Sequence, residues 1–94
     1  MCGITGIFNH HSFQLDEIIT SFNKGKARGP EYTSHESIND VFLGFHRLAI
    51  NGLDVESNQP FVMNKCFLIC NGEIYNWKQL KSTLPGINYT SNSD

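Results

Sequence analysis

The sequence contains no long hydrophobic segment and no block of like charge. Its longest apolar run, residues 66–70, falls far short of the roughly 20 residues that a membrane-spanning helix needs. The N-terminus lacks the basic region of a secretory signal, and Gly3 and Gly6 interrupt its apolar character. With 7 basic and 9 acidic residues, the formal net charge is −2, which argues against a nucleic-acid or anionic-membrane surface. We therefore expect a cytoplasmic protein.

Cysteine is scarce, and its spacing does not favour disulfides or metal ligation. The count of 3 is odd, which disfavours a disulfide framework. On a strand, Cys66 and Cys70 would face the same way but lie about 13 Å apart, too far to bridge, so we expect both in the core. His10 and His11 have no spaced cysteine or carboxylate partner, and no CxxC or HxxxH spacing occurs. A small metal-binding domain is therefore the weakest hypothesis, and we expect no metal site.

The chain is long enough for one domain at most. It has 94 residues, of which 39% are hydrophobic and 12% aromatic, a composition typical of a globular protein. Residues 41–50 are the strongest strand candidate, because they are rich in Val, Phe, Leu and Ile. Gly44 is the only residue in this segment that disfavours a strand. Arg47 would lie on an apolar face of this strand, where its charge needs a partner or a ligand unless it reaches solvent. Shorter strands are predicted at residues 4–8, 61–63 and 66–70, the last two joined by a tight turn at Asn64-Lys65.

Two helices follow from apolar spacing and stop signals. Apolar residues at i, i+3, i+4 and i+7 predict an amphipathic helix from Leu15 to Phe22, ended by Gly25. A second helix should begin at Asn76, whose side chain we expect to cap it. Its buried face would hold Trp77, Leu80 and Leu84. The remaining segments are predicted as loops over residues 25–37 and 51–60 and as an extended segment over residues 88–94.

The first residues offer a nucleophile and a base in one position. If Met1 is removed, Cys2 carries both a thiol and a free α-amine. Because reference pKa values are about 7.7–8.0 for an α-amine and about 8.5 for a thiol, the amine can accept the thiol proton near neutral pH. The alternative is a small buried residue that opens an apolar strand.

Asn71-Gly72 has two possible roles. Between apolar runs this dipeptide is a strong hairpin signal. On a backbone with unusual dihedral angles, the Asn71 side-chain amide and the Gly72 N–H would instead be two donors that can converge on a developing oxyanion. The residues alone do not decide between these roles.

Taken together, six short motifs closely resemble those of class II glutamine amidotransferases. The nearest resemblance is to the N-terminal glutaminase domain of glutamine-dependent asparagine synthetases, and it covers essentially the whole chain. It implies an α+β fold of the Ntn-hydrolase type, an αββα sandwich with antiparallel sheets, of which residues 1–94 would be the N-terminal portion. The motifs are Met1-Cys2-Gly3-Ile4, Arg28-Gly29-Pro30, Gly44-Phe45-His46-Arg47-Leu48-Ala49-Ile50, Gln59-Pro60, Asn71-Gly72-Glu73-Ile74-Tyr75-Asn76 and Ser93-Asp94.

The resemblance also implies roles for individual residues. Cys2 would be the nucleophile that attacks the side-chain amide of L-glutamine, and Asn71 and Gly72 would form the oxyanion hole. Arg47 would bind the α-carboxylate of glutamine, while Asp94 and Glu73 would hold its α-ammonium group. The glutamine-binding set implied in this way is Arg47, Ile50, Asn51, Asn71, Gly72, Glu73 and Asp94.

The resemblance extends to partners that this chain does not contain. ATP and Mg²⁺ are expected only for a synthetase domain or subunit that amidates activated aspartate, and no Ser-Gly-Gly-x-Asp-Ser loop occurs here. The pocket edge differs from the family pattern, since Asn51-Gly52 stands where a small or apolar residue and an aspartate usually follow. The alternative function is a catalytically inactive fragment that acts as an interaction module through its open sheet edges.

Overall fold

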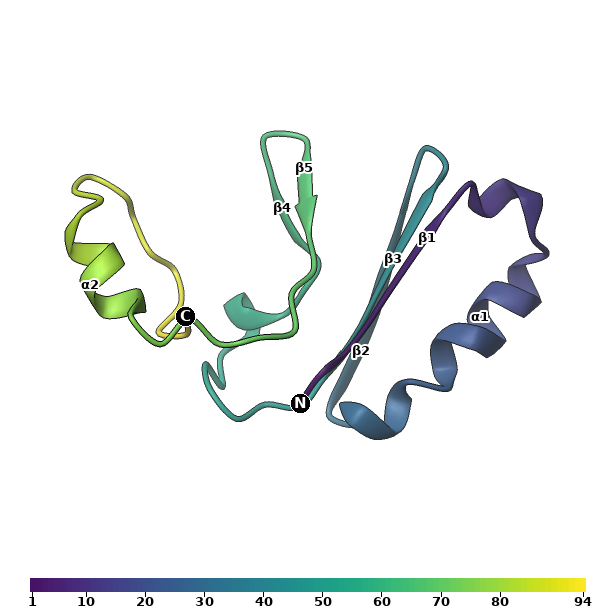
Figure 1. Ribbon diagram of the computed structural model, residues 1–94, viewed down its shortest axis with the longest axis horizontal. Helices are drawn as coiled ribbons and strands as arrows, with labels where there is room; N and C mark the ends of the chain where they lie inside the picture. Colours follow the sequence, from purple (N-terminus) through teal and green to yellow (C-terminus); the bar gives the residue numbers. More distant parts are fainter.

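The larger of two antiparallel sheets has the predicted long strand at its centre. The computed structural model describes all of residues 1–94, with β3 (Val41–Arg47) between β1 (Gly3–Phe8) and β2 (Tyr32–Ile38) (Figure 1). The register pairs Phe8 with Val41 and continues along β1 toward the N-terminus. Because β3 is paired on both edges, its backbone N–H and C=O groups have partners within the sheet. The chain is thus an α+β protein with antiparallel sheets.

The smaller sheet is a hairpin of β4 (Phe61–Met63) and β5 (Cys66–Leu68). Its turn residues, Asn64 and Lys65, have φ values of 49° and 64°. Two successive residues in this left-handed region are characteristic of a type I′ turn, which matches the twist of antiparallel strands. The predicted hairpin and its tight turn are therefore confirmed, although the second strand ends at Leu68.

The two helices lie at opposite ends of the molecule. Figure 1 shows α1 (Leu15–Asn23) along one face of the three-stranded sheet, with the β4–β5 hairpin beyond the other face. Helix α2 (Trp77–Ser82) lies on the far side of the hairpin, near the C-terminus. No helix of the chain has the length and apolar character needed to cross a bilayer.

The hydrophobic core lies between α1 and β3. Ile18 and Phe22 of α1 are buried against Phe42 of β3, and the Phe22 and Phe42 rings meet edge to face with centroids 5.5 Å apart. Gly44 allows this close packing, because a Cβ atom there would overlap the Phe22 ring. The amphipathic helix predicted from apolar spacing is thus confirmed, and its stripe fixes α1 on the sheet.

A buried histidine extends this core toward the end of β3. The His46 ring is fully buried and stacks on Phe22, with centroids 4.1 Å apart. Its Nδ1 lies 2.9 Å from the Thr33 hydroxyl and its Nε2 lies 2.9 Å from the Phe22 carbonyl oxygen. Because both ring nitrogens have partners, the burial of this polar side chain is compensated. His46 thereby links β3 to both α1 and β2, one residue before Arg47.

Several predicted elements were wrong, beginning with the region before β3. Strand β2 (Tyr32–Ile38) was predicted as loop, because its polar sequence carries no apolar run and its side chains are mostly exposed. It forms because β3 offers a free edge in antiparallel register. Strand β3 ends at Arg47 rather than at residue 50.

The predicted burial in the C-terminal half was also wrong. Helix α2 has no buried residue, and Leu80 and Leu84 are 44% and 49% exposed. Asn76 precedes α2 as expected, but its side chain makes no capping hydrogen bond. Cys66 and Cys70 are exposed rather than in the core. The common reason is that the core of this chain is formed by α1 and β3, at the other end of the molecule.

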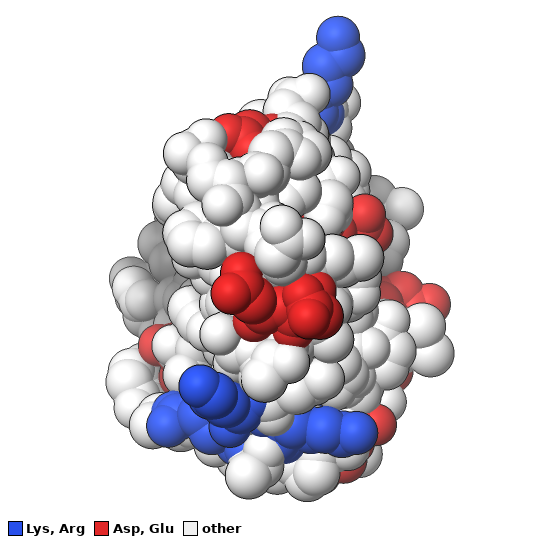
Figure 2. Space-filling model, turned by 90° about the vertical axis from the view of Figure 1, so that its right-hand side faces the viewer, with Lys and Arg blue, Asp and Glu red and all other residues white.

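Charges of both signs are distributed over the face covered by α1 (Figure 2). Figure 2 shows acidic side chains near the middle of this face and basic side chains along its lower edge. The first turn of α1 carries Asp16 and Glu17, and the 3-10 turn η2 (Lys26–Arg28) carries Lys26 and Arg28. Neither sign of charge covers the face as a continuous surface.

Replacing Phe22 with alanine should lower the free energy of unfolding by about 3–5 kcal/mol, because the ring is 1% exposed and packs against Phe42 and His46. Phe8→Ala is the matched control, since Phe8 is 75% exposed and should change the value by no more than about 0.5 kcal/mol. Urea denaturation of the unaltered chain and of the two variants measures both effects. An equal decrease in the free energy of unfolding in the two variants would contradict this placement of the core.

Candidate functional site

One cavity, of about 390 Å³, lies where four separate segments of the chain meet. These segments are the N-terminus, the end of β3 with its following loop, the residues after β5, and the C-terminal residues. Every residue that the sequence predicts for catalysis or glutamine binding lines this cavity: Cys2, Arg47, Ile50, Asn51, Asn71, Gly72, Glu73 and Asp94. The volume falls within the range of small-molecule sites.

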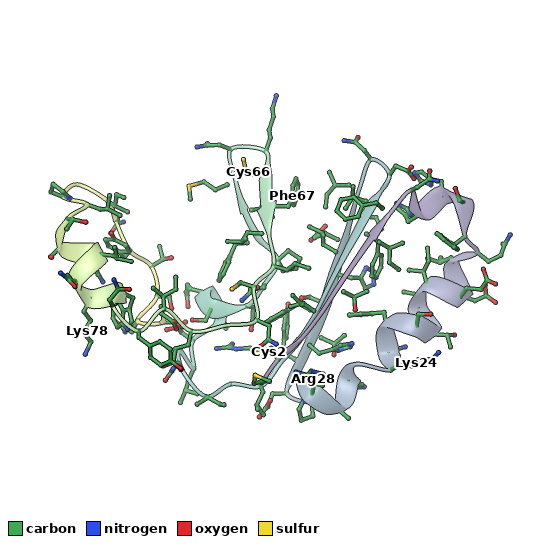
Figure 3. All side chains as sticks on the ribbon, viewed as in Figure 1. Cys2, Lys24, Arg28, Cys66, Phe67 and Lys78 are labelled. Atoms are coloured by element: carbon green, nitrogen blue, oxygen red, sulfur yellow. The ribbon has the colours of Figure 1, made fainter.

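Cys2 lies at the start of β1, beside the end of β3. The antiparallel pairing of Gly3 with His46 brings the residue before β1 next to the residues that follow β3. The Leu48 N–H donates to the Cys2 Sγ at 3.3 Å, and the Sγ lies 3.7 Å from the Leu48 carbonyl oxygen. The Arg28 Nε donates to the Cys2 carbonyl at 3.2 Å, and Figure 3 shows the two side chains at the same end of the sheet. The thiol is therefore held at the cavity, partly exposed.

Arg47 is buried in the cavity wall without a carboxylate partner. Its side chain is 7% exposed. Its Nη1 donates to the Asp54 carbonyl at 3.0 Å and to the Asn58 Oδ1 at 2.6 Å, and its Nη2 donates to the Gly52 carbonyl. All three acceptors are neutral oxygen atoms, so the guanidinium is fixed in place while its positive charge remains uncompensated. The predicted burial of an arginine that needs a partner is confirmed.

The loop that holds Arg47 is stabilised by a capping aspartate. Asp54 precedes the 3-10 turn η3 (Val55–Ser57), and its Oδ1 accepts the Ser57 N–H at 3.1 Å and the Ser57 hydroxyl at 2.6 Å. The hydroxyl of Ser91 also reaches this oxygen at 3.3 Å. The Ser57 hydroxyl lowers the pKa of Asp54 below its ordinary value of 3.8, with Ser91 acting in the same direction and partial burial opposing. Asp54 thus links the Arg47 loop to the C-terminal segment.

The Asn71-Gly72 segment is not a hairpin turn. It lies between β5 and α2, and neither residue has a positive φ. Gln59 holds the start of this segment, because its Oε1 accepts the Cys70 N–H at 2.5 Å while its carbonyl accepts the hydroxyl of Ser34 on β2. Asn71 and Gly72 line the cavity in this arrangement.

Two acidic residues, Glu73 and Asp94, also line the cavity. Asp94 accepts the Ile74 N–H with its Oδ2 and the Ser93 hydroxyl with its Oδ1, the latter at 3.3 Å. The first of these bonds holds Asp94 beside Ile74, the residue that follows Glu73. The cavity therefore has a cationic group at Arg47 and a pair of carboxyl groups at Glu73 and Asp94.

Sequence reasoning missed half of the cavity lining. Most of the missed residues stand in the motifs that carry the resemblance but received no role there, and their place in the cavity follows only from the meeting of the four segments. Asp54, which supports the wall without lining it, had a readable signal, because aspartate is a preferred N-cap residue. The additional lining residues are Met1, Phe45, Leu48, Ser57, Gln59, Cys70, Tyr75 and Ser93.

Outside this cavity, one cluster has the composition of a metal site. His10, His11 and Asp40 each place a potential ligand atom within 4.8 Å of the others. The expectation that the two histidines lack a carboxylate partner was therefore wrong. Asp40 reaches them through the pairing of β1 with β3, although it is 29 positions from His11 in the sequence.

Asp54→Ala should lower the free energy of unfolding near neutral pH, and the loss should shrink under acid conditions. The folded-state pKa of Asp54 lies below its ordinary value of 3.8, so its contribution is complete above that pH and disappears as the pH falls through the lowered folded-state pKa. Denaturant unfolding of both proteins between pH 3 and pH 7 measures this. Glu56→Ala is the control, because Glu56 is exposed and lies two residues after Asp54 in the same turn. It should lower the free energy of unfolding by less. A loss for Asp54→Ala that grows with acidity would contradict the assignment.

Comparison with known proteins identifies the family. The model of the glutamine amidotransferase domain family matches residues 1–94. The chain is 36% identical to asparagine synthetase (glutamine-hydrolyzing) 1 of Bacillus subtilis over 100% of its own length and 16% of that protein. It is 34% identical to asparagine synthetase (glutamine-hydrolyzing) of Gallus gallus over 86% of its length and 15% of that protein. No solved structure gives a significant match. The chain therefore belongs to the glutamine amidotransferase domain family and spans about one sixth of the relatives that it matches.

Proposed function

We propose that this chain carries a glutaminase site, which hydrolyses the side-chain amide of L-glutamine to glutamate and ammonia. The observation that carries the proposal is that all eight residues implied for this chemistry, from four separate segments, line one cavity. Membership of the glutamine amidotransferase domain family supports the same substrate. The two relatives described above are named as glutamine-hydrolysing asparagine synthetases.

The charges of the cavity suit the two ends of an amino acid. Arg47 is buried and bonded only to neutral oxygen atoms, so an anionic ligand would supply its missing counter-charge. Its planar guanidinium can donate two parallel hydrogen bonds to a carboxylate. Glu73 and Asp94 would bind the α-ammonium group, and the backbone of Ile50 and Asn51 would complete the wall. With both ends of the amino acid bound in this way, its side chain would reach Cys2, which lines the same cavity.

Cys2 would be the nucleophile, with its own α-amine as the base once Met1 has been removed. The amine takes the thiol proton, and the thiolate attacks the side-chain amide carbon of glutamine. Return of that proton to the departing nitrogen releases ammonia and leaves a γ-glutamyl thioester. Water, deprotonated by the same amine, then attacks the thioester and frees glutamate and the thiol. The Leu48 N–H that points at Sγ would stabilise the thiolate.

The oxyanion of each tetrahedral intermediate needs hydrogen-bond donors. The side-chain amide of Asn71 and the backbone N–H of Gly72 would serve this purpose from the cavity wall. One such donor contributes about 2.7–4 kcal/mol to the lowering of the barrier. Gln59 would position them, because it holds the preceding Cys70 N–H at 2.5 Å.

The fold of the complete domain would be the αββα sandwich of Ntn hydrolases. What supports this is the order of elements in Figure 1, in which α1, the three-stranded sheet, the hairpin and α2 follow one another across the molecule. Residues 1–94 would form the N-terminal portion. In a longer protein, a synthetase domain or subunit that uses ATP and Mg²⁺ would receive the ammonia and amidate activated aspartate to asparagine.

A second candidate function is a catalytically inactive interaction module. Only 10 of 94 residues are buried, and large apolar side chains of the hairpin and α2 face solvent, including Val62, Met63, Leu68 and Leu80. Such a surface is suited to packing against another polypeptide. Turnover of glutamine by the isolated chain separates the two functions.

The proposal predicts that the purified chain releases glutamate from L-glutamine and that Cys2→Ala abolishes this release. Cys70→Ala is the matched control, because Cys70 lines the same cavity but has no role in the mechanism. Enzymatic detection of glutamate measures the rates. Equal activity in Cys2→Ala and the unaltered chain would disprove the nucleophile, and no release by the unaltered chain would favour the interaction module.

The same assay distinguishes binding from catalysis. Asn71→Ala should lower kcat by about 10²–10³-fold with little change in KM, because the oxyanion exists only in the transition state and intermediates. Arg47→Lys should mainly raise KM, since a lysine keeps the charge but loses the two-pronged contact. A loss of kcat alone in Arg47→Lys would contradict the carboxylate-binding role.

A further inference from the structure

A second group of chemically reactive side chains lies at the opposite end of β1 from Cys2. It consists of His10 and His11, in the 3-10 turn η1 (His10–Ser12) that follows β1, and Asp40, in the turn between β2 and β3. Figure 1 shows this turn beside the end of β1. Since β1 is 6 residues long and a strand rises about 3.4 Å per residue, roughly 20 Å separates the group from Cys2. The proposed glutaminase chemistry does not use it.

We propose that His10, His11 and Asp40 form a binding site for a divalent transition metal of the zinc type. Two imidazoles and one carboxylate are a ligand set that zinc prefers, and three protein ligands leave a position for water. Zinc bonds these atoms at about 2.0–2.2 Å, which puts tetrahedral ligands about 3.4 Å apart, so ligand atoms that now lie within 4.8 Å of one another would close by up to about 1.4 Å. The side chains of His11 and Asp40 are 69% and 44% exposed, which gives them the freedom for this movement.

The backbone already holds the three residues together. The His10 N–H donates to the Asp40 carbonyl at 3.2 Å, and the His11 N–H donates to the Asp40 Oδ1 at 3.0 Å. Both chain segments reach this geometry through a residue in the left-handed region, Asn9 with φ of 59° and Asn39 with φ of 52°. The site would therefore require movement of side chains but no refolding of the chain.

The two imidazole rings have the surroundings of metal ligands. The Nε2 of His10 is buried and has no hydrogen-bond partner, a state that is rare for a buried polar atom and that a metal ion would relieve. The Nε2 of His11 lies 2.9 Å from the Asn39 carbonyl oxygen. The same nitrogen lies 3.8 Å from the Asp40 Oδ1, so it could share an ion with this carboxylate once it gives up its contact with the Asn39 carbonyl. The rings lie close, with centroids 4.2 Å apart.

Metal binding would cross-link the three strands. The metal would join the end of β1 to the turn between β2 and β3, at the end of the sheet farthest from the cavity. Because the three ligands come together only in the folded chain, metal binding should raise the unfolding temperature. This effect does not depend on glutamine hydrolysis, so the two proposals can fail separately.

Nuclear magnetic resonance of the histidine rings tests the site directly. On addition of one equivalent of Zn²⁺ to the purified chain, the ring signals of His10 and His11 should shift, whereas those of His35 and His46 should not. The last two are internal controls, since His46 is fully buried with both nitrogens bonded and His35 lies outside the cluster. Shifts that are absent from His10 and His11, with zinc taken up elsewhere or not at all, would overturn the proposal.

Two shape-conserving variants test the ligands. Asp40→Asn keeps an oxygen that can accept the His11 N–H, and His10→Phe keeps the ring but removes its unpartnered nitrogen. Each should weaken Zn²⁺ binding by more than the roughly 10- to 100-fold that loss of an outer partner costs. Glu36→Gln, on the exposed surface of β2, is the control and should bind as the unaltered chain does. Calorimetric titration measures the affinities, and unchanged binding by both ligand variants would contradict the site.

Discussion

The antiparallel pairing of β1 with β3 is the constraint on which both ends of the three-stranded sheet depend. At one end it brings Cys2 beside the residues that follow Arg47, and at the other it brings His10 beside Asp40. A shift of one residue in this register would turn every side chain of β1 to the opposite face and separate both groups. This register also lets Ile7 of β1 pack against the core formed by Ile18, Phe22 and Phe42.

The cavity contains one cationic side chain, Arg47, that neutral hydrogen-bond acceptors hold in place. Arg47 is held by carbonyl and amide oxygens of its own loop, and Asp54 holds that loop through Ser57 and Ser91. Such a guanidinium is positioned before a ligand arrives, which lowers the entropy cost of binding. Its charge stays uncompensated, since a neutral oxygen does not cancel it. A buried cation of this kind favours an anionic ligand, in agreement with the glutamine carboxylate that we propose.

The sequence predicted those parts of the fold that rest on local patterns. Apolar spacing located α1, and the turn residues Asn64 and Lys65 located the hairpin. The polar strand β2 could not be predicted, because its stability comes from pairing with β3 rather than from its own residues. The site residues were found through their resemblance to a family, and the cavity now unites them. Asp40 was missed because only the strand pairing makes it a neighbour of His11.

Covalent labelling tests most directly whether this cavity is a glutaminase site. The purified chain would be incubated with the glutamine-analogue electrophile 6-diazo-5-oxonorleucine, and its intact mass and peptide map recorded before and after. The account predicts loss of Met1 and a single adduct on Cys2, with none on the exposed Cys66 and Cys70. A processed chain that takes up no adduct, or one labelled at the exposed cysteines alone, would contradict it.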